Sequence, residues 1–380
     1  MRLNASEVRR AAIGCSVLVA ALLTASCGGG QPTTTFRATR IIAFGDETSV
    51  IDDFRGDGNG RKYSVNATVS ATDPTLACRS NPIWIQTVAN LYGGLVFAAC
   101  NPGPTPVTSP PNRIRAGFGA KAADLAAQID AQIAESPFQA GDLVTVLIGA
   151  NDVLAQYAQY PAVSESLLGD NLDAAGAEVG RQVNRLGGLG AKVIVSTIPD
   201  IGFSPYAIAE KAAHIDTDRQ AMIIRLTLRF NTSLRAALDN DGRKIGLVLM
   251  DEFVEATAKF VGLNGFANSS TGVCDLTKSA LVPPSILDCT DLTLIMGGSS
   301  TAFLWADDRH LSYGGQLALG NLAAARARNN PFCARAARLR QGRREGMGAS
   351  AASSAVHSTS ASSAGRAASA FGWLTIATTT

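Results

Sequence analysis

The sequence contains few residues of the kinds that hold metals. Only 3 of its 380 residues are histidine, and it has no C-x-x-C pair and no histidine-rich cluster. Cysteine and histidine ligands at fixed spacing are the usual mark of a zinc site, so we expect no metal and no cofactor. A large excess of charge is also absent, because the formal net charge is only +2. We therefore expect no nucleic-acid partner.

The N-terminus has an apolar stretch, but this stretch is short. Residues 11–25 are apolar or small, whereas a transmembrane helix needs about 20 consecutive apolar residues. Arg2, Arg9 and Arg10 precede the stretch, and small residues follow it. The order basic, apolar, small is typical of an export signal. We predict that residues 1–26 are a signal peptide that is removed and that the protein is exported.

The segment Leu23–Cys27 (LTASC) resembles a bacterial lipoprotein box, in which the cysteine becomes the lipidated first residue of the mature chain. Thr24 stands where such boxes usually have leucine, and ordinary cleavage nearby is the alternative. The resemblance implies a lipid anchor at Cys27 on a membrane and a location in the cell envelope, in the periplasm or at the outer membrane. The glycine- and threonine-rich residues that follow predict a flexible tether over residues 27–38.

Five cysteines remain after Cys15 and Cys27, and they fit an exported protein. Their spacing suggests that Cys78 pairs with Cys100 and that Cys274 pairs with Cys289, although spacing alone does not fix the connectivity. Cys333 is then left over. Two such disulfides would staple two loop-rich insertions in an oxidising compartment.

Short apolar runs alternate with helical patterns along most of the chain. The predicted strands cover residues 41–44, 94–100, 142–148, 191–197 and 245–250, and the predicted helices cover residues 83–92, 120–135, 164–189, 209–240 and 311–328. Apolar strands separated by helices require right-handed crossovers and a parallel sheet covered on both faces. We predict an α/β fold, a flavodoxin-like three-layer α/β/α sandwich with a parallel sheet of about five strands.

The predicted domain spans residues 39–332. Residues 50–111 are rich in glycine, proline and threonine and should form the walls above a site, and residues 251–300 are a second loop-rich insertion. Residues 333–380 are first arginine-rich and then rich in serine and alanine. This composition predicts a disordered tail, because it has no core-forming periodicity.

Three short blocks carry polar residues at the expected ends of strands or in a loop. They are the segment Ile41–Ser49 (IIAFGDETS), the segment Asp142–Asp152 (DLVTVLIGAND) and the segment Trp305–Gly315 (WADDRHLSYGG). In order they resemble the Gly-Asp-Ser, Gly-x-Asn-Asp and Asp-x-x-His blocks of the SGNH (GDSL) hydrolases. The resemblance covers residues 40–328 and implies the SGNH hydrolase fold with an esterase site.

The resemblance implies a role for several residues of these blocks. His310 would be the base and Asp307 would accept its Nδ1 proton, while Asn151 would donate to the oxyanion, with Gly149 allowing close approach. A glycine N–H would be a second donor, and of Gly117 and Gly119 we favour Gly117. Structural readings compete with these roles: a surface loop for His310, a loop cap for Asp307 and an Asx turn for Asn151.

The nucleophile does not follow the family pattern, because Glu47 stands directly after Asp46 in the position of the serine. An ionised Glu47 beside Asn151 would fill the oxyanion hole and would pair with a protonated His310, raising the pKa of the histidine. Ser49 is the alternative nucleophile, but a shift of two residues moves a side chain by about 6 Å. The competing reading of Ser49 is a helix N-cap.

Two functions from different classes follow from these residues. The first is an exported, monomeric esterase or acylhydrolase that acts on ester bonds of a lipid or an acylated glycan through Ser49, with His310 and Asp307. The second is an inactive member of the fold that binds a glycan or acyl ligand in the former cleft of Asp46 and Glu47. A general-base role for Glu47 and a purely structural envelope protein are less favoured.

Overall fold

The computed structural model describes residues 33–239, 241–329 and 333–335. The predicted signal peptide, Cys27 and most of the predicted tail lie outside these residues. The last predicted tether residues and the first tail residues are described, and they form two short strands, β1 (Thr33–Thr35) and β13 (Cys333–Arg335). These strands pair in antiparallel fashion, with Thr33 opposite Arg335.

A five-stranded parallel sheet is the centre of the fold. Its members are β2 (Arg40–Gly45), β7 (Arg113–Ile114), β8 (Asp142–Leu147), β9 (Lys192–Ser196) and β10 (Ile245–Val248). The spatial order is β10-β9-β8-β2-β7. Numbered along the chain, this is the order 2-1-3-4-5 of the flavodoxin-like sheet. The predicted α/β sandwich with a parallel sheet of about five strands is confirmed.

The inner strands β2, β8 and β9 are buried on both faces, which is why each appears in the sequence as a mainly apolar run. In β2, Ile42 and Phe44 face the helices of one layer, whereas Ile41 and Ala43 face the other layer. All four side chains are fully buried. Successive side chains of a strand point to opposite faces of the sheet, so the four apolar residues of β2 are shared between two hydrophobic cores.

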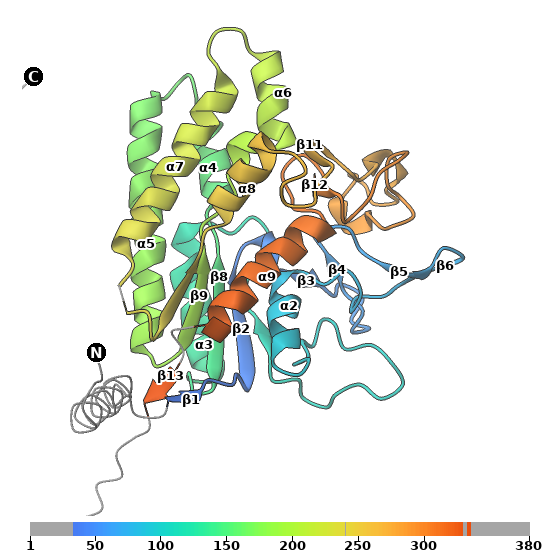
Figure 1. The fold of residues 1–380 in the computed structure, drawn as a ribbon, viewed down its shortest axis with the longest axis vertical. Helices are drawn as coiled ribbons and strands as arrows, with labels where there is room; N and C mark the ends of the chain where they lie inside the picture. The colour runs from blue at the N-terminus through green and yellow to red at the C-terminus, as the bar shows by residue number, and fades with distance from the viewer. Residues whose placement is uncertain (1–32, 240, 330–332, 336–380) are drawn as a thin grey trace, which may run out of the picture. The chain divides into compact units, whose positions relative to one another are not determined.

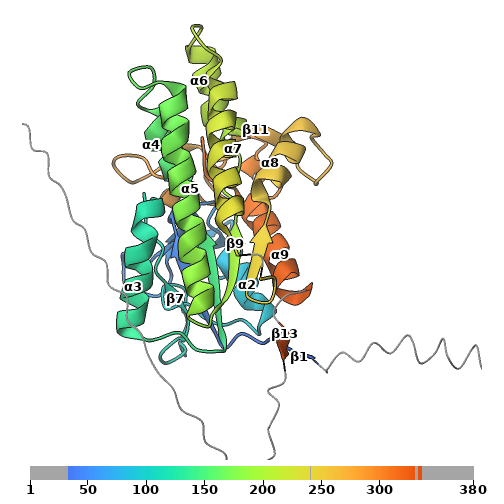
Figure 2. The same cartoon turned by 90° about the vertical axis from the view of Figure 1, so that its left-hand side faces the viewer.

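Helices cover both faces of the sheet (Figures 1 and 2). One layer contains α3 (Leu125–Glu135), α5 (Glu165–Gly188) and α7 (Arg219–Ala237). The other contains α2 (Trp84–Leu91), α8 (Met250–Lys259) and α9 (Tyr313–Asn329). The remaining helices of the described chain are α4 (Ala150–Tyr157), α6 (Pro205–Ala213) and the 3-10 turns η1 (Glu47–Ser49), η2 (Ala122–Asp124), η3 (Ile201–Phe203), η4 (Leu276–Lys278) and η5 (Ile286–Asp288).

Three details differ from the sequence-based prediction. Residues 94–100 form no strand and make two isolated bridges, from Phe97 to Asn112 and from Cys100 to Asn59. The helix predicted over residues 209–240 is divided into α6 and α7, and Asp218 caps the new start by accepting from the Ala221 N–H at 3.0 Å. The start of the predicted insertion is helical, since α8 begins at Met250.

The loop-rich segments form small paired strands and carry both disulfides. Cys78 is bonded to Cys100 and Cys274 to Cys289, as predicted. The short strands are β3 (Ile51–Asp52), β4 (Arg61–Lys62), β5 (Thr68–Ser70), β6 (Asp73–Leu76), β11 (Asn268–Gly272) and β12 (Phe303–Trp305). Within the part of the chain that the structure describes, no helix has the length and apolar character needed to cross a membrane.

Candidate active site

The site forms where the carboxyl ends of β2 and β8 meet. These two strands are neighbours, and the chain leaves them in opposite directions across the sheet, which is the switch point where ligands bind in open α/β folds. The Asp46 N–H donates to the Leu147 carbonyl oxygen at 3.1 Å. Gly45 has a φ of +131°, and a Cβ there would overlap the same Leu147 carbonyl. Only glycine therefore fits where β2 ends.

Glu47 begins the turn η1 directly after β2, and its side chain is almost fully buried. Asp46 caps this turn, because its Oδ1 accepts from the Thr48 N–H at 3.0 Å. The short turn points the Glu47 carboxylate toward the end of β8. The end of β2 and the turn η1 thus fix the position of this carboxylate.

Three groups surround the Glu47 carboxylate. Its Oε2 accepts from Asn151 Nδ2 at 2.9 Å and from the Gly119 N–H at 3.0 Å. Its Oε1 lies 3.6 Å from His310 Nε2, which is an ion-pair distance. The contacts expected of Glu47 with Asn151 and His310 are therefore present. The choice of Gly117 is corrected, because the Gly117 N–H donates to the Gly45 carbonyl at 3.0 Å.

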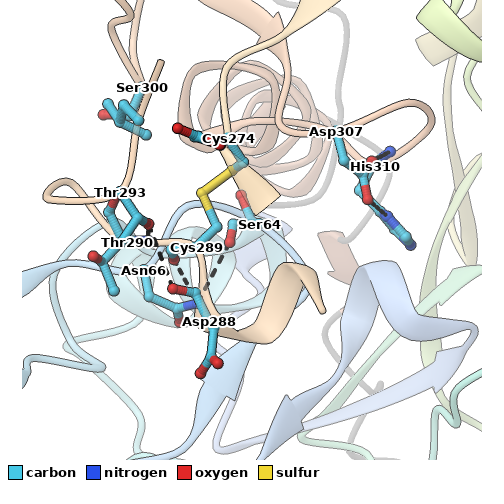
Figure 3. The surroundings of a disulfide bond; sticks show 12 residues. Ser64, Asn66, Cys274, Asp288, Cys289, Thr290, Thr293, Ser300, Asp307 and His310 are labelled. Carbon is cyan, nitrogen blue, oxygen red and sulfur yellow. Dashed lines mark hydrogen bonds and ion pairs between the residues drawn. A yellow bond between two sulfur atoms is a disulfide. The ribbon is translucent and has the colours of Figure 1, made fainter. Parts of the chain in front are cut away.

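Asp307 and His310 belong to one tight turn after β12. His310 Nδ1 lies 2.7 Å from Asp307 Oδ2, and the other oxygen, Oδ1, accepts from the His310 N–H at 2.7 Å. Figure 3 shows both side chains near the Cys274–Cys289 disulfide. The Cys274 N–H donates to the Ala306 carbonyl at 2.7 Å, so the disulfide loop is bonded to the start of this turn.

The ring of His310 is charged at neutral pH in this arrangement. Burial opposes its protonation, but the carboxylates of Asp307 and Glu47 outweigh this effect and raise the pKa of His310 to about 10. Burial also opposes ionisation of Glu47, but the neighbouring His310 cation and the hydrogen bonds from Asn151 and Gly119 hold the pKa of Glu47 below its ordinary value. The neutral imidazole that a general base requires is therefore scarce at pH 7.

The pKa of Asp46, beside Glu47, is shifted in the opposite direction from that of Glu47. Asp46 is fully buried, and burial together with the charge of Glu47 raises the pKa of Asp46 to about 8. Its Oδ2 has no hydrogen-bond partner. A protonated Asp46 thus avoids placing a second negative charge next to Glu47.

Ser49 does not lie where a nucleophile is needed. It is fully buried at the end of η1, and its Oγ accepts from the indole Nε1–H of Trp84 at 3.0 Å. Among the described residues, no hydrogen bond joins Ser49 to His310. The three-residue turn directs Glu47 toward His310 and Ser49 into the core with α2, so nucleophilic attack by Ser49 stays a prediction that this geometry does not support.

Three further residues, Tyr63, Phe118 and Asp152, lie at the site without having been predicted as site residues. Tyr63 stacks on Phe118 with 5.2 Å between ring centroids, and the rings of Tyr63 and His310 are 6.0 Å apart. Phe118 is 70% exposed. Asp152 Oδ2 accepts from the Ala122 N–H at 2.9 Å and holds the loop that carries Gly119. Tyr63 and Phe118 had no sequence signal, whereas Asp152 stands in the same block as Asn151.

Among the described residues, no group of three or more histidine, cysteine, aspartate or glutamate side chains is arranged so that it could hold a metal ion. Gly149 precedes α4 with a φ of +130°, and a Cβ there would overlap the ring of Phe230. Gly149 is the N-cap of α4, which begins at Ala150, and so it sets the position of Asn151 in the first turn of this helix.

Comparisons with known proteins place this chain among hydrolases. The acetylxylan esterase Axe2 from Geobacillus stearothermophilus is 15% identical, with 79% of this chain and 99% of that chain covered and a TM-score of 0.37. The α/β hydrolase enzyme LAE5 from the metagenome of Lake Arreo is 14% identical, with 77% and 96% covered and a TM-score of 0.37. A search of curated proteins found no match. The profile of the GDSL-like lipase/acylhydrolases matches residues 85–323, more than half of the sequence, and the chain therefore belongs to the GDSL-like lipase/acylhydrolase family.

Proposed function

We propose that this chain is a ligand-binding member of the family that does not hydrolyse esters by a serine mechanism, and that its ligand is a glycan or an acylated glycan. The observation that carries the proposal is the position of the Glu47 carboxylate. Its Oε2 occupies both N–H donors, from Asn151 and Gly119, that would otherwise receive an ester oxyanion.

The chemistry of a carboxylate supports the absence of turnover. Attack by Glu47 on an ester would give a mixed anhydride and expel an alkoxide, which is a poor exchange compared with attack by an activated hydroxyl. The fixed negative charge of Glu47 would also repel a developing oxyanion. His310 is held protonated, with its pKa raised to about 10, and cannot accept a proton from an attacking hydroxyl.

An aromatic surface beside the site supports a ligand with an apolar face. Phe118 is 70% exposed and stacks on Tyr63, whose ring is 6.0 Å from that of His310. Exposed aromatic rings offer large, rigid contact area at low entropic cost. The C–H face of a sugar ring or an acyl group would pack on Phe118, with the polar groups of the ligand directed to Glu47 and His310.

The test is a gain of function. His310, Asn151 and Gly119 contact the Glu47 side chain, and Asp307 contacts His310. Glu47→Ser should therefore complete a serine hydrolase site. We expect the unchanged protein to give no fluorophosphonate adduct. Glu47→Ser should give an adduct on residue 47 and hydrolyse p-nitrophenyl acetate, and the double variant Glu47→Ser/His310→Ala should lose both.

A second candidate is the acylhydrolase activity expected from the family, and the bonded Asp307–His310 pair favours it. It requires η1 to rearrange so that Glu47 withdraws and Ser49 leaves Trp84. An adduct of the unchanged protein on Ser49 that is lost in Ser49→Ala and in His310→Ala would establish this activity and would end the non-hydrolytic proposal.

We also propose that the protein is exported and is anchored to a membrane of the cell envelope through a lipid at Cys27. The order of basic, apolar and small residues at the N-terminus supports export, and the two disulfides fit an oxidising compartment. Intact-mass analysis of the mature chain tests this proposal. A diacylglycerol mass on Cys27, lost in Cys27→Ser, supports the anchor, and an unlipidated N-terminus excludes it.

A further inference from the structure

A cavity of about 420 Å³ lies among the inserted loops, apart from the Glu47 site. Its walls come from the segment between β3 and β4, from the β5–β6 hairpin and from residues 278–293. Ligand sites in proteins typically have volumes of about 300–1,000 Å³. None of the residues around the Glu47 carboxylate lines it. It is therefore a separate place where a ligand could be held.

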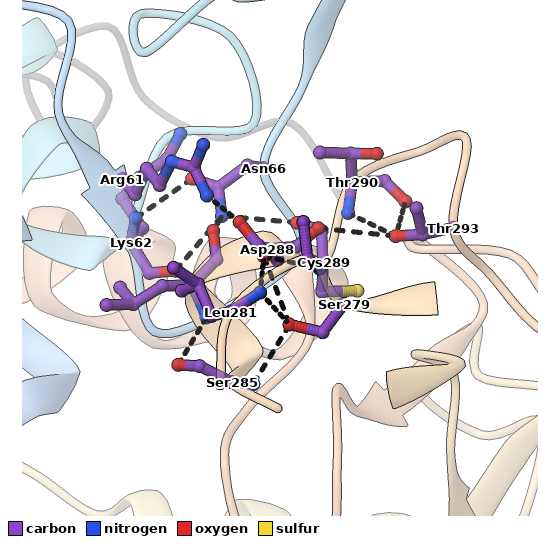
Figure 4. Close-up of polar contacts among 12 residues, drawn as sticks. Arg61, Lys62, Asn66, Ser279, Leu281, Ser285, Asp288, Cys289, Thr290 and Thr293 are labelled. Carbon is purple, nitrogen blue, oxygen red and sulfur yellow. Dashed lines mark hydrogen bonds and ion pairs between the residues drawn. The ribbon is translucent and has the colours of Figure 1, made fainter. Parts of the chain in front are cut away.

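The walls of this cavity are firmly connected. Figure 4 shows Asp288 as the centre of a network in which it accepts hydrogen bonds and an ion pair from neighbouring loops. Its Oδ2 receives the Ser279 hydroxyl at 3.0 Å and the Leu281 N–H at 2.9 Å, and its Oδ1 pairs with Arg61. The next residue, Cys289, carries a disulfide. A site held in this way is formed before a ligand arrives, which lowers the entropic cost of binding.

A second cavity, of about 690 Å³, adjoins the first. Both are lined by Asp52, Asp53 and Phe54, so the loop of these residues forms the ridge between them. The second cavity is also lined by Val50 and Ala116. Val50 directly follows η1 in the sequence, and Ala116 is three residues from Gly119, but none of the residues that contact the Glu47 carboxylate lines this cavity. We call the two cavities together the Phe54 groove.

The ridge carries an aromatic ring and two guanidinium groups. Phe54 is 56% exposed, and the guanidinium carbons of Arg55 and Arg61 lie 5.6 Å and 5.5 Å from its ring centroid. The Nε of Arg61 is buried and has no hydrogen-bond partner, and no carboxylate in the described chain pairs with Arg55. The guanidinium group of Arg55 therefore remains available as a donor next to an aromatic surface.

The charges lining the first cavity nearly balance, with four carboxylates against three cations. The charged lining residues are Asp52, Asp53, Asp57, Asp288, Arg55, Arg61 and Lys278. A ligand of high charge of either sign would meet groups of its own sign. The threonine hydroxyls of the lining can both donate and accept. This combination suits a ligand with many hydroxyl groups and no net charge.

We infer that the Phe54 groove binds an extended neutral polysaccharide chain, which crosses Phe54 and occupies both cavities. The shared ridge accounts for the length of the ligand, and the hydroxyl and guanidinium groups account for its chemistry. This inference uses different residues from the Glu47 site and stands whether or not that site turns over esters.

Isothermal titration of the purified protein with xylohexaose, chitohexaose and hexagalacturonate tests the inference. We expect binding of at least one neutral hexaose, weaker binding of the corresponding trisaccharide, and weaker binding of hexagalacturonate. Phe54→Ala should weaken the binding of that hexaose by about tenfold or more, because exposed aromatic anchors dominate such interfaces. Phe260→Ala is the matched control, since Phe260 is 64% exposed and lies outside the groove.

Folding of each variant is checked by circular dichroism and by the melting temperature. Failure of both neutral hexaoses to bind would overturn the inference, as would unchanged affinity in a folded Phe54→Ala variant. Tighter binding of hexagalacturonate than of either neutral hexaose would overturn the assignment of a neutral ligand. None of these readouts depends on adduct formation at residue 47, so the outcome is separate from the test of the Glu47 site.

Discussion

Glu47 and His310 form an ion pair in the place where the family pattern has a serine and its base. The pair is buried, and Asp307 holds the other side of the imidazole at 2.7 Å. A buried carboxylate with two N–H donors and a neighbouring cation is well satisfied. The same contacts that stabilise Glu47 remove the free donors and the neutral base that ester hydrolysis needs.

The protonation of His310 is the most direct check of this ion pair. In the unchanged protein the His310 ring proton signals should titrate only near pH 10, because Asp307 and Glu47 raise the pKa of His310 to about 10. Glu47→Gln removes one negative charge and should lower that pKa by about one unit or more. Proton NMR of the ring follows the titration. Equal midpoints in the two proteins would show that Glu47 does not act on His310.

Lys62 is a second buried ionisable group, and backbone oxygens surround its amine. Burial lowers the pKa of Lys62 to about 7. Its Nζ donates to the carbonyl oxygens of Ser80 at 2.7 Å, Asn81 at 2.8 Å and Cys78 at 3.2 Å. Lys62→Met keeps the length of the side chain but leaves these carbonyls without their donor. We expect the free energy of unfolding to fall by about 2–4 kcal/mol, measured by urea denaturation.

Lys259→Met is the control for Lys62→Met. Lys259 is exposed and pairs with Glu255 on the same helix, and such pairs contribute about 0.5 kcal/mol or less. An equal effect of the two substitutions would mean that the three carbonyl contacts of Lys62 add nothing to stability.

At the scale of elements, Gly149 sets the geometry at the end of β8, as Gly45 does at the end of β2. Gly149 stands between β8 and α4 with a φ of +130°, and a Cβ there would overlap the Phe230 ring from α7. Gly149→Ala should therefore lower the free energy of unfolding by about 2 kcal/mol or more, as measured by urea denaturation. The substitution should also displace Asn151, because Asn151 lies in α4.

Gly188→Ala is the matched control for Gly149→Ala. Gly188 ends α5, and a Cβ there would meet nothing within 4 Å. Alanine is favoured over glycine in a helix by about 0.5–1 kcal/mol, so no loss of stability is expected. A tolerated Gly149→Ala would contradict the tight fit of α4 against α7.

The predictable elements were those whose signal lies in their own residues. Strands β2, β8 and β9 are buried on both faces, so each appears as an apolar run, and each was expected at nearly its observed bounds. The edge strand β7 has only two residues and follows a proline-rich segment, so it had no detectable pattern. The break between α6 and α7 was missed because helical spacing continues on both sides of residues 214–218.

At the scale of the whole molecule, the ion pair should appear in the dependence of stability on pH. The pKa of His310 is raised in the folded state to about 10 from an ordinary value of 6.5. The stability that this shift contributes is therefore fully present below pH 6.5 and is lost as the pH rises toward 10.

The comparison of the unchanged protein with Glu47→Gln isolates this contribution. We expect the difference in their free energies of unfolding to shrink steadily between pH 6.5 and pH 10, measured by urea denaturation at each pH. A constant difference across this range would show that the ion pair is not linked to the titration of His310.

The candidate site was only partly accessible from sequence. Asp307 and His310 are three residues apart, so their contact is local and was expected. The contacts of Glu47 with Asn151 and His310 were expected from the three blocks together. The choice of Gly119 over Gly117, and the inward direction of Ser49, depend on how a loop and a three-residue turn are placed by the elements beneath them.

By itself the sequence determined the layered fold and the replacement of the family serine by Glu47, and its cysteine spacing suggested the two disulfide pairs, because periodicity, spacing and residue identity are properties of the chain itself. Only the tertiary structure decided which groups surround that carboxylate, where Ser49 points and that two cavities meet at Phe54. These features are made by segments far apart in the chain, and their relative positions follow from packing on a common sheet, which no local pattern encodes.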